Sequence, residues 1–259
     1  MREIRLCDDC KKEMTVNLCR ENKLGIEIQT FHDPYLENQD VLVSEYQDLL
    51  SGLPGGRSLH APFWELNIGT KMRGIQKETM EMFQYAYRIA QRLGCTEVIV
   101  HNGYIPGTSL YSGWVQRAAA FWRRFFQNKD DSIILCIENQ FEEDSELMKM
   151  EIDEVHDPRL KICLDIGHAH ANSRQSAEEW IASLGERIHY LHLHNNHGKQ
   201  HQKGHNDDEH LALQNGTMDI QKILRTAERF CPNAIWAVES SAPYLRESVC
   251  DLKNMGYLR

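Results

Sequence analysis

The sequence predicts an α/β protein with a single (βα)8 fold, the TIM barrel, in which eight parallel strands close into a ring. Three observations support this prediction. Short apolar runs alternate eight times with longer segments of helical period. The chain has 259 residues, a common size for one such barrel. No linker, composition break or short internal repeat divides residues 1–259, so we expect one domain.

The elements follow from the period and from the residues at their ends. The predicted strands are residues 3–7, 25–31, 57–62, 97–102, 132–139, 161–166, 188–194 and 234–239. The predicted helices are residues 10–22, 41–50, 75–93, 113–128, 145–156, 177–184, 219–230 and 242–255. Gly94 can take the left-handed conformation that ends a helix, and Asp219 can accept amide hydrogens where a helix begins. Strict alternation implies parallel strands joined by right-handed crossovers.

One connection departs from this regular pattern. The loop of residues 195–215, between the seventh strand and its helix, is long and rich in histidine, asparagine and acids. Loops of this length in a compact domain are usually functional or disordered.

Composition narrows the class of protein. The net charge is −9, from 38 acids and 29 bases, with no basic block that would indicate general binding to nucleic acid or anionic membranes. The first ten residues lack the apolar core of a signal peptide, and the longest purely apolar stretch, residues 133–137, cannot span a bilayer. We therefore expect a cytoplasmic protein. Cys7 and Cys10 form a CxxC pair without a second pair, so reduced, packed thiols are the favoured interpretation over a zinc or redox site.

Histidines and acids gather where the predicted strands end. They are His60, His101, Glu138, Asp165 with His168, His192 with His194, and Glu239, together with Asp208 and His210 in the long loop. In a closed parallel barrel the carboxyl ends of all strands meet at one mouth. His, Asp and Glu side chains that converge there are the ligand types of a divalent metal ion.

The two-residue period of a strand sorts these side chains by face. His192 and His194 share one face, whereas His189 points to the other and is expected to be structural. Glu138 and Asp165 each end an otherwise apolar row. Ionised carboxylates buried without partners are costly, and three of them (with Glu239) at one barrel end repel each other. A divalent cation would remove both costs.

The strand-end segments HAPF, VHNG, IEN, LDIGHAHA, LHLHNN, DDEH and VES resemble, in order, those of the xylose isomerase-like barrel superfamily. The resemblance runs from about residue 25 to about residue 240. This superfamily contains sugar isomerases, epimerases and the endonuclease IV class of abasic-site nucleases. The resemblance implies a first ion, Mn²⁺, Zn²⁺, Co²⁺ or Mg²⁺, held by Glu138, Asp165, His192 and Glu239. One ion is expected. Up to three are possible, because the nuclease pattern also matches His60 and His101 beside Glu138, and His168, Asp208 and His210.

Two reactions fit such a centre. The first is isomerisation or epimerisation of a sugar or sugar phosphate, with Glu138 and Glu239 moving the proton of a metal-bound α-hydroxycarbonyl. The second is hydrolysis of a phosphodiester at an abasic site by clustered zinc ions. The complete set of nine positions favours the nuclease, but IENQFEED lacks the Thr-Ala-Gly that follows the glutamate in that class, and the loop after the second strand carries no arginine. We favour the isomerase over the nuclease, and both over a barrel that only binds.

The expected partner is a small sugar, with nucleic acid less favoured and no membrane. His60, His101, His194 and Trp64 are candidates for contacts with the substrate, and four basic residues in predicted mouth loops could bind a phosphate: Lys71, Arg73, Lys199 and Lys203.

Overall fold

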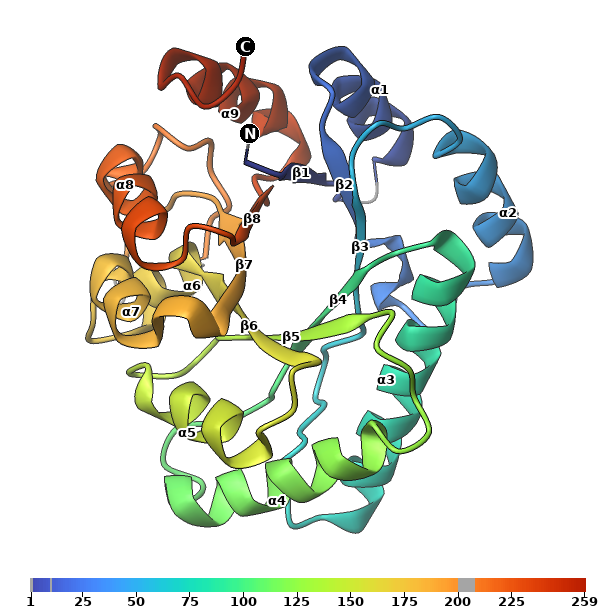
Figure 1. Cartoon of the computed structure of the whole chain (residues 1–259), viewed down its shortest axis with the longest axis vertical. Helices are drawn as coiled ribbons and strands as arrows, with labels where there is room; N and C mark the ends of the chain where they lie inside the picture. The colour runs from blue at the N-terminus through green and yellow to red at the C-terminus, as the bar shows by residue number, and fades with distance from the viewer. Residues whose placement is uncertain (1, 10, 200–207) are drawn as a thin grey trace.

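The computed structural model describes residues 2–9, 11–199 and 208–259. Its eight strands form a closed parallel barrel in the order of the chain, which confirms the predicted fold class (Figure 1). The strands are β1 (Ile4–Cys7), β2 (Gly25–Ile28), β3 (Arg57–His60), β4 (Glu97–His101), β5 (Ile134–Glu138), β6 (Leu160–Asp165), β7 (Ile188–Leu193) and β8 (Ile235–Val238).

The helices surround this ring on the outside (Figure 1). They are α1 (Lys12–Asn22), α2 (Gln39–Leu49), α3 (Arg73–Leu93), α4 (Tyr111–Phe125), α5 (Glu146–Val155), α6 (Ile166–Asn172), α7 (Ala177–Leu184), α8 (Ile220–Phe230) and α9 (Ala242–Asn254). Two 3-10 turns, Thr30–His32 and Gly185–Arg187, complete the described elements. Within the described ranges no helix has the length and apolar character needed to cross a membrane.

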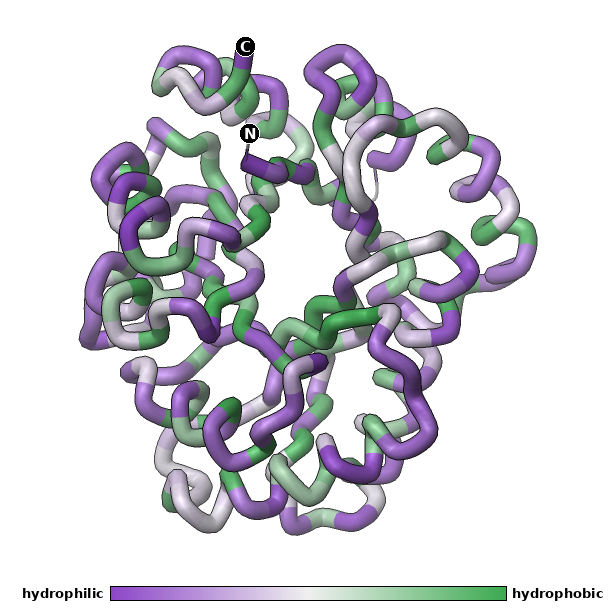
Figure 2. Tube along the Cα trace, viewed as in Figure 1, coloured by the Kyte–Doolittle hydropathy of each residue, from purple (hydrophilic) through white to green (hydrophobic). Residues whose placement is uncertain are grey.

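Apolar side chains pack in two layers, one on each face of the sheet. The larger layer lies between strands and helices and includes Phe83, Tyr87 and Leu93 from one face of α3. The smaller layer fills the interior of the barrel with Cys7, Ile99, Cys136, Cys163, Tyr190, Ile235 and Ala237. Figure 2 shows apolar stretches along the central strands and mixed polarity along the surrounding helices. The polar residues at the strand ends lie above this interior layer.

The predicted helix ends are confirmed at two positions. Gly94 ends α3 in the left-handed conformation, with φ 68° and ψ 34°. The side chain of Asp219 accepts the backbone N–H of Lys222 at 3.0 Å where α8 begins. Cys10, the first residue of the first predicted helix, lies outside the described residues, as does the central part of the long loop, residues 200–207.

Two local predictions need correction. The second strand ends at Ile28 rather than at residue 31, because Thr30–His32 turns into a 3-10 segment. The segment after β6 is not the loop that the pattern predicts, since α6 follows Asp165 directly. The Asp165 carboxylate accepts the backbone N–H of His168 at 2.6 Å and so caps this helix of seven residues. A helix this short has too few turns to show an amphipathic period.

Candidate metal centre

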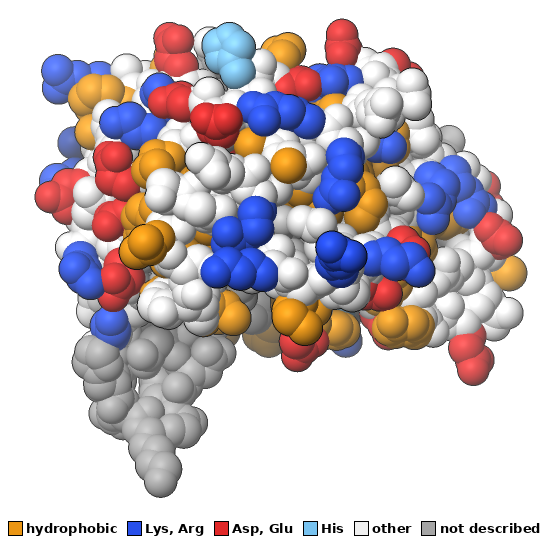
Figure 3. Space-filling view, turned by 90° about the horizontal axis from the view of Figure 1, so that it is seen from below, with side chains coloured by type: hydrophobic (Ala, Val, Ile, Leu, Met, Phe, Trp, Pro, Cys, Tyr) orange, Lys and Arg blue, Asp and Glu red, His pale blue; other side chains and the backbone are white. Residues whose placement is uncertain are grey.

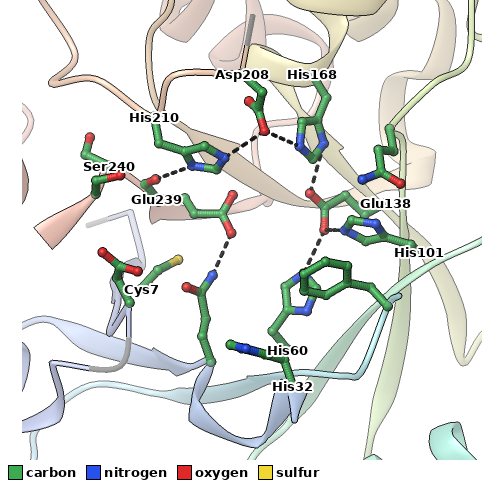
Figure 4. A pocket seen from close by; sticks show the side chains of 15 residues that line it. Cys7, His32, His60, His101, Glu138, His168, Asp208, His210, Glu239 and Ser240 are labelled. Carbon is green, nitrogen blue, oxygen red and sulfur yellow. Dashed lines mark hydrogen bonds and ion pairs between the residues drawn. The ribbon is translucent and has the colours of Figure 1, made fainter. Parts of the chain in front are cut away.

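The pairing of the strands places acids beside histidines at the mouth. His101 on β4 is level with Glu138 on β5, and Asp165 on β6 is level with His192 on β7. A cavity of about 270 Å³ opens above them (Figure 4). Its described lining consists of Cys7, Asp9, Gln29, His32, His60, Phe63, His101, Glu138, Gln140, His168, Asp208, His210, Glu239, Ser240 and Ser241.

Glu138 stands at the centre of this arrangement, and four histidines approach its carboxylate. His60 Nε2 and His101 Nε2 lie 3.2 and 3.1 Å from Oε2. His192 Nδ1 and His168 Nδ1 lie 3.1 and 3.3 Å from Oε1. Figure 4 shows His60, His101 and His168 directed at this one carboxylate. Each oxygen of the Glu138 carboxylate therefore faces two imidazoles.

Asp165 is fully buried and is held from several sides. The Asn139 side chain pairs with both backbone groups of Asp165, at 2.8 and 2.9 Å. His194 Nε2 lies 3.1 and 3.2 Å from its two carboxylate oxygens. Gly167 makes this approach possible, because a Cβ at that position would lie 2.0 Å from the His194 ring. The carboxylate is thus fixed in position before any ligand binds.

His192 lies among three carboxylates. Its Nδ1 lies 3.1 Å from Glu138 Oε1, 3.1 Å from Glu239 Oε2 and 3.7 Å from Asp165 Oδ2. Glu239 Oε2 is buried and receives no hydrogen bond from any described residue. Three carboxylates and one imidazole therefore face a common point, and one of these oxygens still lacks a donor.

A second cluster lies on the rim of the mouth. Asp208 Oδ2 lies 3.3 Å from His168 Nε2 and 3.0 Å from His210 Nε2. His168, Asp208 and His210 thus lie close enough for their ligand atoms to share one ion, as do those of His60, His101 and Glu138. The structure brings together all nine residues that the resemblance implied.

The hydrogen bonds of the histidines decide which ring nitrogen faces the cavity. Backbone carbonyl groups accept Nδ1–H from His60 (Ala61, 2.9 Å), His168 (Asn139, 2.8 Å) and His210 (Glu239, 2.7 Å). Each Nε2 is left facing a carboxylate in the cavity. Metal-binding histidines in proteins are oriented in this way, through a partner on the other ring nitrogen.

The charges of the site depend on one another. Burial would raise the pKa of Glu138 and Asp165, but the surrounding histidines outweigh it and hold the pKa of both carboxyls below their usual range. Burial would lower the pKa of His168 and His192, but neighbouring groups raise the pKa of both well above the ordinary value: Asp165 and Asp208 beside His168, and Cys163 with the surrounding glutamates beside His192. The pKa of His210 rises to about 10, against burial, mainly because of Asp208. The ionised carboxylates thus require positive charge nearby, either from protonated histidines or from a metal ion.

The donor set fits a divalent ion. Ligand atoms bound to one ion at about 2.1 Å lie roughly 3.0 to 3.4 Å apart, which is close to most of the separations around His192. Imidazole and carboxylate together suit Zn²⁺, Mn²⁺ and Co²⁺. In this site Glu138, Asp165, His192 and Glu239 would hold the first ion.

The remaining candidate residues take different positions. His60 and His101 line the cavity, where they could also contact a substrate. His194 is fully buried, and its ring stacks on that of His210 with centroids 3.9 Å apart, so its described contacts are to other site residues. Trp64 is 55% exposed and lines a neighbouring groove with His32. His189 lies 3.3 Å from Glu97, and neither residue is among those that line the cavity.

Sequence reasoning missed three residues of the site: Glu27, Gln29 and Cys7. Glu27 is fully buried on β2, with its carboxylate 3.0 Å from His192 Nε2. Gln29 Nε2 donates to Glu239 Oε1 at 2.6 Å. The signal was present in the segment GIEIQT, where period two places Glu27 and Gln29 on one face of an otherwise apolar strand.

Comparison with known proteins agrees with the fold. The chain is 26% identical over 194 residues to the uncharacterized protein MJ1311 of Methanocaldococcus jannaschii, and the match covers 70% of this chain and 63% of that protein. The TTHB071 protein of Thermus thermophilus, whose crystal was soaked with ZnCl2, superimposes with a TM-score of 0.76 at 22% identity, over 98% of this chain and 97% of that one. A D-tagatose 3-epimerase-like protein superimposes with a TM-score of 0.77 at 21% identity, over the same shares of the two chains.

The xylose isomerase-like TIM barrel family matches residues 13–246, a range that includes strands β2 to β8. The closed barrel and this match lead to one conclusion. The chain belongs to the xylose isomerase-like TIM barrel family.

Proposed function

We propose that the protein is a divalent-metal-dependent isomerase or epimerase of a sugar. The observation that carries this proposal is the position of two carboxylates, Glu138 at the end of β5 and Glu239 directly after β8, each 3.1 Å from His192 Nδ1. Two acid–base groups beside one Lewis-acid site are what the exchange of a carbon-bound proton requires. The similarity to a D-tagatose 3-epimerase-like structure supports the same class of reaction.

Each residue has a defined part in this chemistry. When bound, the ion would polarise adjacent oxygens of an α-hydroxycarbonyl compound and acidify the C–H bond between them. Glu239 or Glu138 removes that proton as a general base, and the proton returns to the neighbouring carbon in isomerisation or to the opposite face in epimerisation. In this proposal His60 and His101, which line the cavity, contact the hydroxyl groups of the substrate.

The lining of the cavity favours a neutral sugar over a sugar phosphate. None of its described residues is Lys or Arg, whereas Asp9 and Asp208 add negative charge at the mouth. Lys71 is exposed and lines a neighbouring groove. Figure 3, seen from the α4 side, shows Lys and Arg side chains gathered on the outer surface, where Lys71, Arg117, Arg123 and Arg124 line a shallow pocket. Basic side chains therefore lie outside the described part of the active cavity.

The direct test is deuterium exchange. Protein loaded with Mn²⁺, Co²⁺ or Zn²⁺ is incubated with a panel of ketoses and their phosphates in deuterated water. Deuterium should enter at the carbon beside the carbonyl, with higher kcat/KM for a free sugar than for its phosphate. Glu239→Gln should lower turnover by about 100-fold or more, because an amide cannot accept a proton at neutral pH.

Glu247→Gln on α9 is the matched control, because this glutamate is exposed and outside the cavity. Its turnover should equal that of the unchanged protein. Absence of exchange with every sugar tested would contradict the proposal.

A second candidate function has its own support. The rim cluster of His168, Asp208 and His210 completes three ion positions, which is the arrangement that the resemblance links to abasic-site nucleases. Chelator-sensitive cleavage of an abasic-site duplex, without exchange on any sugar, would assign the protein to this second function.

A further inference from the structure

Glu27 is a buried acid that the proton-transfer chemistry does not use. Its side chain is fully inaccessible, and an ionised carboxylate in such a position is costly unless it is paired. Its partners are His192 Nε2 at 3.0 Å, Gln29 Nε2 at 3.3 Å and the Cys7 thiol at 3.4 Å. The closest of these partners is His192, so the Glu27 carboxylate lies directly beside the imidazole of a proposed metal ligand.

His192 differs from the other oriented histidines of the site. His60, His168 and His210 use a backbone carbonyl to hold Nδ1–H and turn Nε2 toward the cavity. His192 is reversed, because Nδ1 faces Glu138 and Glu239 while Nε2 faces Glu27. Its partner is also a full negative charge rather than a carbonyl dipole.

We propose that Glu27 is the positioning residue that makes His192 a metal ligand through Nδ1. By accepting Nε2–H, Glu27 fixes the tautomer in which Nδ1 carries the lone pair, and its charge raises the basicity of the imidazole. This inference rests on the metal centre proposed above. It adds the identity of the ligating nitrogen and the residue that selects it.

Gln29 extends the same support to a second ligand. Its side chain lies on the same face of the chain as Glu27, two residues further on. Its Nε2 donates to Glu239 Oε1 at 2.6 Å and to Glu27 Oε1 at 3.3 Å. One neutral amide thus joins the two carboxylates and leaves Glu239 Oε2 directed at His192 Nδ1, 3.1 Å away. Glu27 and Gln29, at the end of β2, therefore orient two proposed ligands, His192 and Glu239.

A competing assignment makes Glu27 a ligand itself. The ligand atoms of Cys7, Glu27, His192 and Glu239 also lie within 4.8 Å of one another. However, Glu27 approaches Nε2, whereas Glu138 and Glu239 both approach Nδ1. A site containing Glu27 would therefore use the other ring nitrogen, and this difference can be measured.

The first measurement needs no variant. Long-range ¹H–¹⁵N spectra of zinc-loaded, ¹⁵N-histidine-labelled protein report which nitrogen of His192 carries the proton, with His192→Gln used for the assignment. We expect a protonated Nε2 and a zinc-bound Nδ1. A zinc-bound Nε2 would overturn the inference and favour Glu27 as a ligand.

The second measurement is the affinity for Zn²⁺ and Mn²⁺, by competition with a chromophoric chelator. Glu27→Gln preserves the shape of the side chain and removes its charge, so we expect affinity to fall by about 10- to 100-fold. Glu151→Gln, another fully buried glutamate but on α5, is the matched control and should bind as the unchanged protein does. Gln29→Leu should also weaken binding, because Glu239 loses its donor.

The outcomes separate the two proposals. If the unchanged protein binds neither ion, the proposed metal centre is wrong and this inference with it. If it binds and Glu27→Gln binds within twofold of it, only the positioning role of Glu27 is wrong. If Glu27→Gln does not fold, the spectra of the unchanged protein still decide.

Discussion

Glu151, a buried acid on α5 that is not part of the described cavity lining, allows a quantitative prediction about stability. Its side chain on α5 is fully buried, and one oxygen accepts the indole N–H of Trp122 at 2.7 Å. The other oxygen has no hydrogen-bond partner among the described residues. Burial raises the pKa of Glu151 from 4.5 to about 8, and the Trp122 hydrogen bond only partly offsets this. The folded protein therefore keeps a proton that the unfolded chain releases.

The size and sign of the effect follow from this difference in pKa. Because the folded value is the higher one, stability is fully present below pH 4.5 and falls as the pH rises to about 8. One pKa unit corresponds to about 1.4 kcal/mol, so the loss by pH 8 is roughly 4 kcal/mol. Glu151→Gln keeps an acceptor for Trp122 and cannot ionise. It should match the unchanged protein near pH 5 and exceed its stability by roughly 3 to 4 kcal/mol at pH 8.

The assay is urea unfolding followed by circular dichroism at several pH values between 5 and 8. Glu154→Gln, an exposed acid of the same helix, is the control and should change stability by less than about 0.5 kcal/mol at every pH. A difference between Glu151→Gln and the unchanged protein that does not grow with pH would refute the reasoning.

Three further changes test other parts of the structure. Glu138→Ala should abolish metal binding, by elemental analysis, while circular dichroism stays unchanged; full metal content in the variant would contradict the role of this carboxylate. Gly167→Ala should displace His194, because the added Cβ would lie 2.0 Å from its ring, and should therefore weaken metal binding; a crystal structure with His194 unmoved would show that this contact is not limiting. Arg5→Leu should destabilise the fold by about 3 to 5 kcal/mol in urea unfolding, because it leaves Glu97 without the buried guanidinium 2.5 Å away; a loss below about 1 kcal/mol would show that Glu97 finds another partner.

The barrel itself could be predicted because period and spacing carry most of the information. Each strand is short, apolar and followed by a helix-length segment, and parallel crossovers leave few ways to connect eight such units. The convergence of His60, Glu138 and Glu239 then follows from topology alone, since all strand ends meet at one mouth. The rim cluster, in contrast, could be anticipated only through the resemblance, because Asp208 and His210 lie in a loop whose sequence has no helical or strand period.

Other parts depend on contacts that a single sequence does not reveal. The helix α6 is too short for a period, and it begins where Asp165 caps the N–H of His168. Glu27 was missed because a lone acid in an apolar strand is equally compatible with a face toward solvent. Only the closed barrel shows that this face points inward, at His192.

The proposed function depends on a divalent ion that binds at the barrel mouth between Glu138, Asp165, His192 and Glu239. The most direct measurement is an anomalous difference map from crystals of zinc-loaded protein, with data collected on both sides of the zinc absorption edge. We expect a peak at about 2.0 to 2.2 Å from one oxygen of each carboxylate and from Nδ1 of His192. Strong peaks confined to exposed histidines, with none at the mouth, would contradict it.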